Sequence, residues 1–157
     1  MVKKPARLII NLLIPLATGA IAAFLTNNAM RAFGELKQPP LSPPAWLFPV
    51  VWTILYVFMG ISAYLISMQG TEREDVQKAF TTYFLQLFFN FGWSILFFQL
   101  KWYLGAFVWL VVLWILILRM IIQFYAIDKR AAYLMIPYLL WVTFAGYLNF
   151  GIYLLNR

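Results

Sequence analysis

Aromatic and hydrogen-bonding side chains recur at helical spacing within three apolar segments of the chain. Steps of three and four residues bring side chains onto one face of a helix. Each of the three faces combines a flat ring with a side-chain amide, a phenol or a small residue that leaves space. The residues on the three faces are Trp52, Tyr56 and Gly60; Gln86, Asn90, Trp93 and Phe97; and Trp141, Ala145 and Asn149.

Turned towards one another, the three faces form a pocket with aromatic walls and a few polar points. Such a lining is typical of a site for a flat, largely apolar ligand. The same residues also fit a structural role, because amide side chains hydrogen-bond neighbouring helices in lipid. For Asn90 and Asn149 both interpretations stay open. Interfacial anchoring suits Trp46 and Trp102, which lie beside loops, better than the tryptophans on the three faces.

Cysteine and histidine are both absent from the sequence. Their absence removes disulfides, thiol chemistry, cysteine or histidine metal sites, Ser-His triads and histidine-ligated haem. Chemistry in this chain therefore depends on Trp, Tyr, Asn, Gln and a few charged groups.

Membrane-spanning helices are the elements that must position these residues. Hydrophobic residues make up 64% of the 157 residues and charged residues only 11%, a composition that cannot cover a water-soluble surface. Because a span of about 20 residues crosses the hydrocarbon core, we expect an all-α integral membrane protein: a bundle of five transmembrane helices in one domain over residues 1–157. We expect the first apolar run to be retained as a helix rather than removed as a signal peptide. The apolar segments cover residues 8–25, 45–68, 79–99, 104–124 and 131–155, approximately.

The net charge of +7 comes from Lys and Arg residues scattered through the short connections. A nucleic-acid surface needs such residues clustered on a soluble face, so we expect no nucleic-acid partner. The side of the membrane that holds more of them is usually cytoplasmic, which predicts a cytoplasmic N-terminus. One side carries Lys3, Lys4, Arg7, Arg73, Lys78, Lys129 and Arg130, and the other carries Arg31, Lys37, Lys101 and Arg157.

A proline-rich segment links the first two apolar segments. It reads LKQPPLSPPAW over residues 36–46. A single proline already removes a backbone donor and disfavours helix at the preceding residue, so this segment exceeds what a helix stop requires. Because each proline ring fixes φ in the unfolded chain as well, the segment becomes ordered at a low entropic cost.

Three stretches of the sequence together resemble the TspO/translocator-protein family, also called the peripheral benzodiazepine receptor or tryptophan-rich sensory protein family. They read LKQPPLSPPAWLFPVVWTILYVFMG (residues 36–60), QLFFNFGWSILFF (residues 86–98) and PYLLWVTFAGYLNFGIYLLN (residues 137–156). Their order, their spacing and the number of spans match the family over nearly the whole chain.

The resemblance implies a five-helix bundle, usually a homodimer, with a pocket closed by the first loop, here about residues 28–44 acting as a stiff lid. It implies a multi-pass receptor or sensor in a bacterial plasma membrane that binds porphyrins such as protoporphyrin IX, and also sterols and isoquinoline-carboxamide or benzodiazepine drugs. No cofactor is required. Two alternatives are a porphyrin or sterol transporter and a light- and oxygen-dependent porphyrin-degrading enzyme, for which Trp52 and Trp141 match the implicated tryptophans.

Site residues follow from the three faces and the resemblance together. We expect the charged Arg31 and Lys37 of the lid loop to face the propionate groups of a porphyrin. The predicted ligand-binding residues are Phe33, Pro43, Pro44, Trp52, Tyr56, Gln86, Asn90, Trp93, Phe97, Trp141, Ala145, Leu148 and Asn149.

The lid loop departs from the family pattern. Ala32 and Phe33 stand where the family commonly has Trp-Tyr, and Leu41 stands where a tryptophan follows the loop prolines. These changes remove aromatic and hydroxyl contacts from the lid. Near the C-terminus, Phe150 takes the place of the tyrosine in the family's cholesterol-recognition pattern, which is a weak pattern in any protein.

Overall fold

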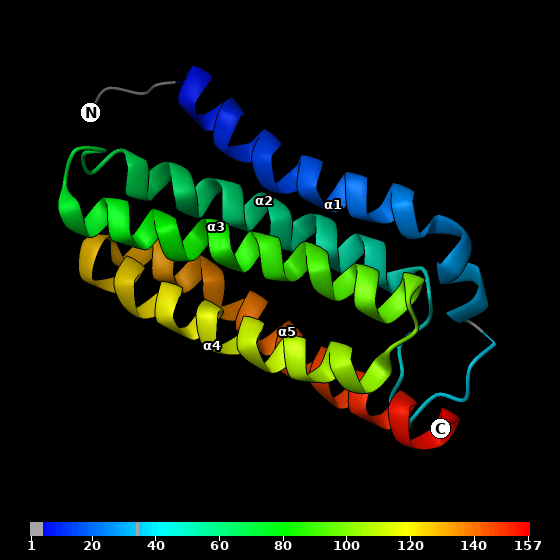
Figure 1. The fold of residues 1–157 in the computed structure, drawn as a ribbon. Coiled ribbons are helices and arrows are strands. Elements are labelled where there is room, and N and C mark those ends of the chain that lie inside the picture. The colour runs from blue at the N-terminus through cyan, green and yellow to red at the C-terminus, as the bar shows by residue number, and fades with distance from the viewer. Residues whose placement is uncertain (1–4, 34) are drawn as a thin grey trace.

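The computed structural model describes residues 5–33 and 35–157, with the backbone alone for residues 28–33. This part of the chain forms five long helices and contains no strand (Figure 1). A π-helical turn, η1, continues the third helix. The elements are α1 (Pro5–Phe33), α2 (Leu47–Ser67), α3 (Glu74–Ser94), η1 (Ile95–Gln99), α4 (Tyr103–Ile127) and α5 (Lys129–Asn156).

The five helices form a closed bundle in the cyclic order α1, α2, α5, α4, α3. The pair α4–α5 is the most extensive, since the single residue Asp128 connects the two helices. The chain enters α1 at one end of the bundle and leaves α5 at the other, as Figure 1 shows. An odd number of passes between the two ends is consistent with this placement.

Lengths and compositions of the helices fit a membrane. Residues Pro5–Asn27 of α1 and the whole of α2, α4 and α5 are long and apolar enough to cross one. Helix α3 is not among these apolar helices, because its first turns carry Glu74, Asp75 and Lys78 and its middle carries Gln86 and Asn90. The two amide side chains are buried inside the bundle. The outer surfaces are apolar, with Phe24 82% exposed and Ile122 63% exposed. These features confirm the predicted all-α helical membrane protein.

Helices α1 and α2 approach closely at Gly60. A Cβ atom added to Gly60 would lie 2.7 Å from the Cα atom of Leu12 and 2.8 Å from the carbonyl oxygen of Asn11. Small residues let helix backbones come together where lipid offers no hydrophobic force between helices. Gly60 was expected on a pocket-facing surface, but here its missing side chain serves helix packing.

Helix α5 begins at a cap made by Asp128. Its carboxylate accepts a hydrogen bond of 3.0 Å from the backbone N–H of Arg130 and pairs with the guanidinium of Arg130 at 2.9 Å. This hydrogen bond with the guanidinium is the main reason why the pKa of Asp128 lies below its usual 3.8. An N-cap of this kind typically contributes about 1 kcal/mol to helix stability.

Helix α1 is longer than the sequence predicts. It continues to Phe33, so the predicted lid at residues 28–44 overlaps the last turns of α1. No proline or glycine interrupts the chain between Ile21 and Phe33, and Thr26 donates a hydrogen bond to the carbonyl oxygen of Ala22 within the helix. The loop proper therefore lies between Phe33 and Leu47.

Candidate ligand-binding site

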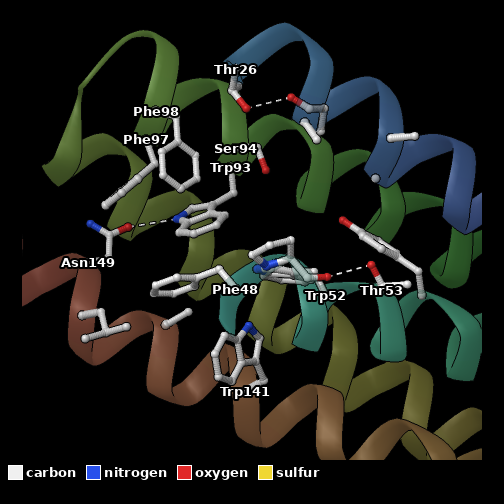
Figure 2. A pocket seen from close by; sticks show the side chains of 18 of the residues that line it. Thr26, Phe48, Trp52, Thr53, Trp93, Ser94, Phe97, Phe98, Trp141 and Asn149 are labelled. Atoms are coloured by element: carbon white, nitrogen blue, oxygen red, sulfur yellow. Dashed lines mark hydrogen bonds between the residues drawn. The ribbon is translucent and has the colours of Figure 1, made fainter. Parts of the chain in front are cut away.

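A cavity of about 410 Å³ lies inside the bundle towards the end that carries the proline-rich loop (Figure 2). Its volume falls within the usual range for small-molecule sites, about 300–1,000 Å³. Side chains from α1, α2, the end of α3, η1 and α5 form its walls. The lining comprises Leu16, Gly19, Ala20, Ala22, Ala23, Thr26, Phe48, Pro49, Trp52, Thr53, Tyr56, Trp93, Ser94, Phe97, Phe98, Trp141, Ala145, Leu148, Asn149 and Ile152.

Residues from all three predicted faces meet at this cavity, although they are far apart in the sequence. Each face contributes at least one aromatic ring. The predicted residues found in the lining are Trp52, Tyr56, Trp93, Phe97, Trp141, Ala145, Leu148 and Asn149.

Trp52 lies at the centre of the aromatic wall. Its ring stacks on Tyr56 with the ring centroids 5.7 Å apart. The rings of Trp93 and Trp141 are 6.3 Å and 6.4 Å from it, and Trp141 meets it edge to face. Figure 2 shows these three indoles converging from α2, α3 and α5. The wall therefore presents both ring faces and ring edges to an occupant of the cavity.

Asn149 lines the cavity and also holds helices together. Its Oδ1 accepts a hydrogen bond of 2.9 Å from the indole Nε1–H of Trp93, and its Nδ2 donates one of 2.8 Å to the carbonyl oxygen of Tyr103. One amide thus links α3, α4 and α5. Asn149 therefore lines the cavity and holds helices together at once, and its amide also fixes the orientation of an aromatic wall residue.

Asn90 and Gln86 lie outside the lining. Tyr56 donates to Asn90 Oδ1 at 2.7 Å, and Asn90 Nδ2 donates to the hydroxyl oxygen of Tyr138 at 2.9 Å. Tyr138 in turn donates to Gln86 Oε1 at 2.7 Å. These buried hydrogen bonds connect α2, α3 and α5. They also hold one wall of the cavity in position, because Tyr56, which donates the first of them, is a lining residue.

The cavity offers few polar atoms to a ligand. Its described lining contains no Asp, Glu, Lys or Arg. The hydroxyls of Thr26 and Thr53 donate to carbonyl oxygens of their own helices, at 2.8 Å and 2.7 Å. The Nε1 atom of Trp141 is buried without a hydrogen-bond partner in the described part of the chain, and Figure 2 shows it on the side of the ring that faces Phe48 and Trp52.

The proline-rich loop is fastened to α5 near the cavity. Asn156 accepts a hydrogen bond of 3.0 Å from the backbone N–H of Lys37 and donates one of 2.9 Å to the carbonyl oxygen of the same residue. Tyr147 donates to the carbonyl oxygen of Pro40 at 2.6 Å. Pro39 is buried against Gly151, where an added Cβ would lie 2.8 Å from its ring.

The described lining contains neither of the two loop prolines predicted to bind the ligand. Pro43 is half-buried and Pro44 is exposed, and neither lines the cavity. Lys37 is exposed on the loop. The side chains of Arg31 and Phe33 lie outside the described residues.

Helix α1 supplies a wall that the sequence analysis missed. Small residues recur there at steps of three and four, which leaves room for the cavity between α1 and the aromatic wall. This spacing is the signal that could have predicted them, since small residues on one face of a membrane helix mark a close approach or a space. The α1 residues of this wall are Gly19, Ala20, Ala22, Ala23 and Thr26.

Known proteins match the chain over nearly its whole length. The sequence profile of the TspO/MBR family matches residues 11–155. The tryptophan-rich protein TspO of Chlorobaculum tepidum is 39% identical over 142 residues, which cover 90% of each chain. Protein CrtK of Rhodobacter capsulatus is 36% identical, covering 88% of this chain and 85% of its own. The translocator protein of Bos taurus is 31% identical, covering 92% of this chain and 87% of its own.

Proposed function

The chain belongs to the TspO/MBR family of membrane proteins, and from this premise and the shape of the cavity we propose that it is a receptor or sensor for a flat, largely apolar ligand, with tetrapyrroles such as protoporphyrin IX as the first candidates. The observation that carries the proposal is the convergence of Trp52, Trp93 and Trp141 on one cavity of about 410 Å³. A macrocycle gains most from such walls, because stacked and edge-to-face rings add to the burial of apolar area.

The polar groups of a porphyrin fit this site only in one orientation. Its propionates would have no cationic partner in the described lining, and burying an unpaired carboxylate is costly. The propionates therefore stay at the mouth, near the proline-rich loop, where Lys37 is exposed and Arg31 belongs to the last turn of α1. The macrocycle enters the cavity, and a neutral acceptor atom can take the free N–H of Trp141.

Sterols and isoquinoline-carboxamide or benzodiazepine drugs are further candidates for the same cavity. They need no cation, because they carry no carboxylate. Sterol binding is thus separable from porphyrin binding by the loop charges. The absence of histidine from the sequence favours free-base porphyrin over haem, which would lack its commonest axial ligand.

The test is a titration in the dark. The purified chain in lipid nanodiscs is titrated with protoporphyrin IX while tryptophan emission is recorded. Saturable quenching at one ligand per chain is expected, and Trp52→Leu should weaken it. Trp114→Leu is the matched control, because Trp114 bonds Thr143 and lies outside the lining. Quenching that never saturates, or that responds equally to both variants, would overturn the proposal.

Photo-oxidative porphyrin degradation is the second candidate function, and the contact between Trp52 and Trp141 favours it. Both indoles line the cavity with centroids 6.4 Å apart. Indole is the most easily oxidised side chain there, and dioxygen would serve as the terminal oxidant. Under light, Trp141→Phe should retain porphyrin in the dark titration but bleach it more slowly. Unchanged bleaching would count against this candidate.

A homodimer and a bacterial plasma-membrane location complete the proposal, and transport is an alternative to it. Support for the location comes from the bacterial relatives, which are more similar to the chain than the bovine one. A transporter is the weaker alternative, because the acidic side chains of the described helices, Glu74 and Asp75, lie in the first turn of α3 and none lies deep inside a helix where it would couple movement to protons. Vesicle uptake along a gradient would decide for transport, and its absence would favour the sensor.

A further inference from the structure

A second hollow lies on the outside of the bundle, between α2 and α5. It is a groove of about 400 Å³ with apolar walls. Ile54 and Leu140 stand at its rim, with 48% and 64% of their surfaces exposed. Because both helices cross the membrane, the groove opens towards the lipid. Its walls include Val51, Ile54 and Phe58 from α2 and Leu140, Trp141 and Phe144 from α5.

Trp141 belongs to the walls of both the internal cavity and this groove. On the cavity side its ring meets Phe48 with centroids 5.8 Å apart, and on the groove side it meets Phe144 at 5.7 Å. It is the one residue common to the two linings in the described part of the chain. The indole is therefore a partition between the ligand cavity and the lipid-facing groove.

Ring contacts hold this partition in place, without the hydrogen bond that fixes other indoles in the described part of the chain. The indole N–H groups of Trp93, Trp109 and Trp114 all donate to protein acceptors, at 2.9 Å, 2.7 Å and 2.8 Å. The N–H of Trp141 has no such partner among the described residues. Rotation of this side chain breaks no hydrogen bond. Pro137, one helical turn earlier, also lacks the N–H that a helix interior normally uses, which weakens the backbone beside Trp141.

The other approach to the cavity is restrained. At the loop end, the side chains of Asn156 and Tyr147 hold the proline-rich loop to α5. A flat apolar molecule concentrates in the bilayer rather than in water, so it meets the groove first. Passage through the groove keeps it away from water throughout.

We propose that the groove between α2 and α5 is a lateral portal through which ligands pass between the bilayer and the cavity, with the Trp141 side chain as its gate. The nature of the physiological ligand rests on the function proposed above, but the route does not. A ligand-independent probe can therefore test it.

The chain contains no cysteine, which makes a single introduced thiol a clean probe. Ser94→Cys places one in the cavity lining. In nanodiscs, it is treated with a small uncharged maleimide that dissolves in the bilayer, and in parallel with a sulfonated maleimide that stays in water. The uncharged reagent should label it faster. Equal or faster labelling by the sulfonated reagent would show entry from water and overturn the portal.

Two substitutions that fill the groove, called plugs below, and one control substitution test whether the reagent passes through the groove. Leu140→Trp and Ile54→Trp each place a bulky ring in the groove from opposite rims, and neither replaces a residue of the cavity lining. Ile115→Trp adds the same ring to the lipid-facing surface of α4, where Ile115 is 56% exposed. Each plug should slow labelling by the uncharged reagent about tenfold, the order expected from an overpacking barrier. The control should not. Unchanged rates in both folded plugs, or equal slowing in the control, would refute the portal.

Removing the gate should change the labelling rate in the opposite direction. Trp141→Ala joins the groove to the cavity and should accelerate labelling, whereas an unchanged rate would argue against a gate. If protoporphyrin IX binds, Leu140→Trp should lower its association and dissociation rates by the same factor and leave Kd unchanged. If the labelling results hold but porphyrin does not bind, the proposed function fails and the portal stands. If porphyrin binds but the plugs change no rate, the portal fails alone.

Discussion

The Oδ1 atom of Asn149 accepts a hydrogen bond of 2.9 Å from the Nε1–H of Trp93, so an amide on α5 sets the orientation of an aromatic ring on α3. Both residues are buried, at 0% and 7% exposure. The contact joins the stability of the bundle to the shape of the cavity, because both partners are lining residues.

Asn149→Leu should destabilise the protein by about 1–3 kcal/mol, because a buried N–H of Trp93 loses its partner. Thermal unfolding in detergent measures the loss. In a Trp93→Phe background, which has no indole N–H, the same substitution should cost clearly less. Equal costs in the two backgrounds would mean that the contact contributes little.

The packing of Pro39 against Gly151 should determine how firmly the proline-rich loop is held to α5. Gly151→Ala places a Cβ only 2.8 Å from the ring of Pro39, too close for an ordinary contact, and should increase proteolytic cleavage of the loop severalfold. Gly146→Ala is the matched control, because the nearest atom to its new Cβ is a flexible Leu110 carbon at 3.7 Å. Similar cleavage rates in both variants would contradict this role of Gly151.

The cations at the mouth should distinguish porphyrins from sterols. Replacing Arg31 and Lys37 together by Gln should weaken protoporphyrin IX about tenfold or more, the order of two lost charge-assisted contacts. Sterol affinity should not change. Equilibrium titration with both ligands gives the comparison, and an equal loss for the two would refute the assignment of these residues to the propionates.

Acid should loosen the junction between α4 and α5. The guanidinium of Arg130 holds the pKa of Asp128 below its usual 3.8 in the folded protein. The unfolded chain therefore takes up the proton first, and the contribution of Asp128 is present above about pH 4 and is lost as pH falls through the folded value. In thermal unfolding, Asp128→Asn should be less stable than the native chain at pH 7, with the difference vanishing at low pH. A difference that is the same at all pH values would contradict this origin.

Much of the fold followed from the sequence because membrane spans leave a strong signal. Apolar runs of the length of a span, separated by short polar connections, gave the helices to within several residues at most ends. The end of α1 was the exception. The chain beyond Leu25 becomes more polar, yet it contains no helix breaker before Phe33, and the helix continues.

The site was harder to predict than the fold, because helical spacing shows which residues share a face but not which of them reach the cavity. Trp52, Trp93 and Trp141 reached the cavity as their faces predicted. Asn90 shares a face with Trp93, but lies one turn deeper and bonds Tyr56 and Tyr138 instead. Hydrogen-bond partners from other helices decide such cases, and no local pattern encodes them. The α1 wall was overlooked for a related reason, since small residues carry no chemistry of their own.

The most direct test of the central claim fills the cavity and measures binding. Ala145 is 6% exposed and lines the cavity, so Ala145→Phe places a ring in the ligand's space. Val112→Phe adds the same ring to the lipid-facing surface of α4, where Val112 is 39% exposed. Dark titration with protoporphyrin IX in nanodiscs should show at least about a tenfold loss of affinity for the first variant, as expected when overpacking displaces a ligand. It should show none for the second. Wild-type affinity in a folded Ala145→Phe protein would mean that the porphyrin binds elsewhere and would contradict the account.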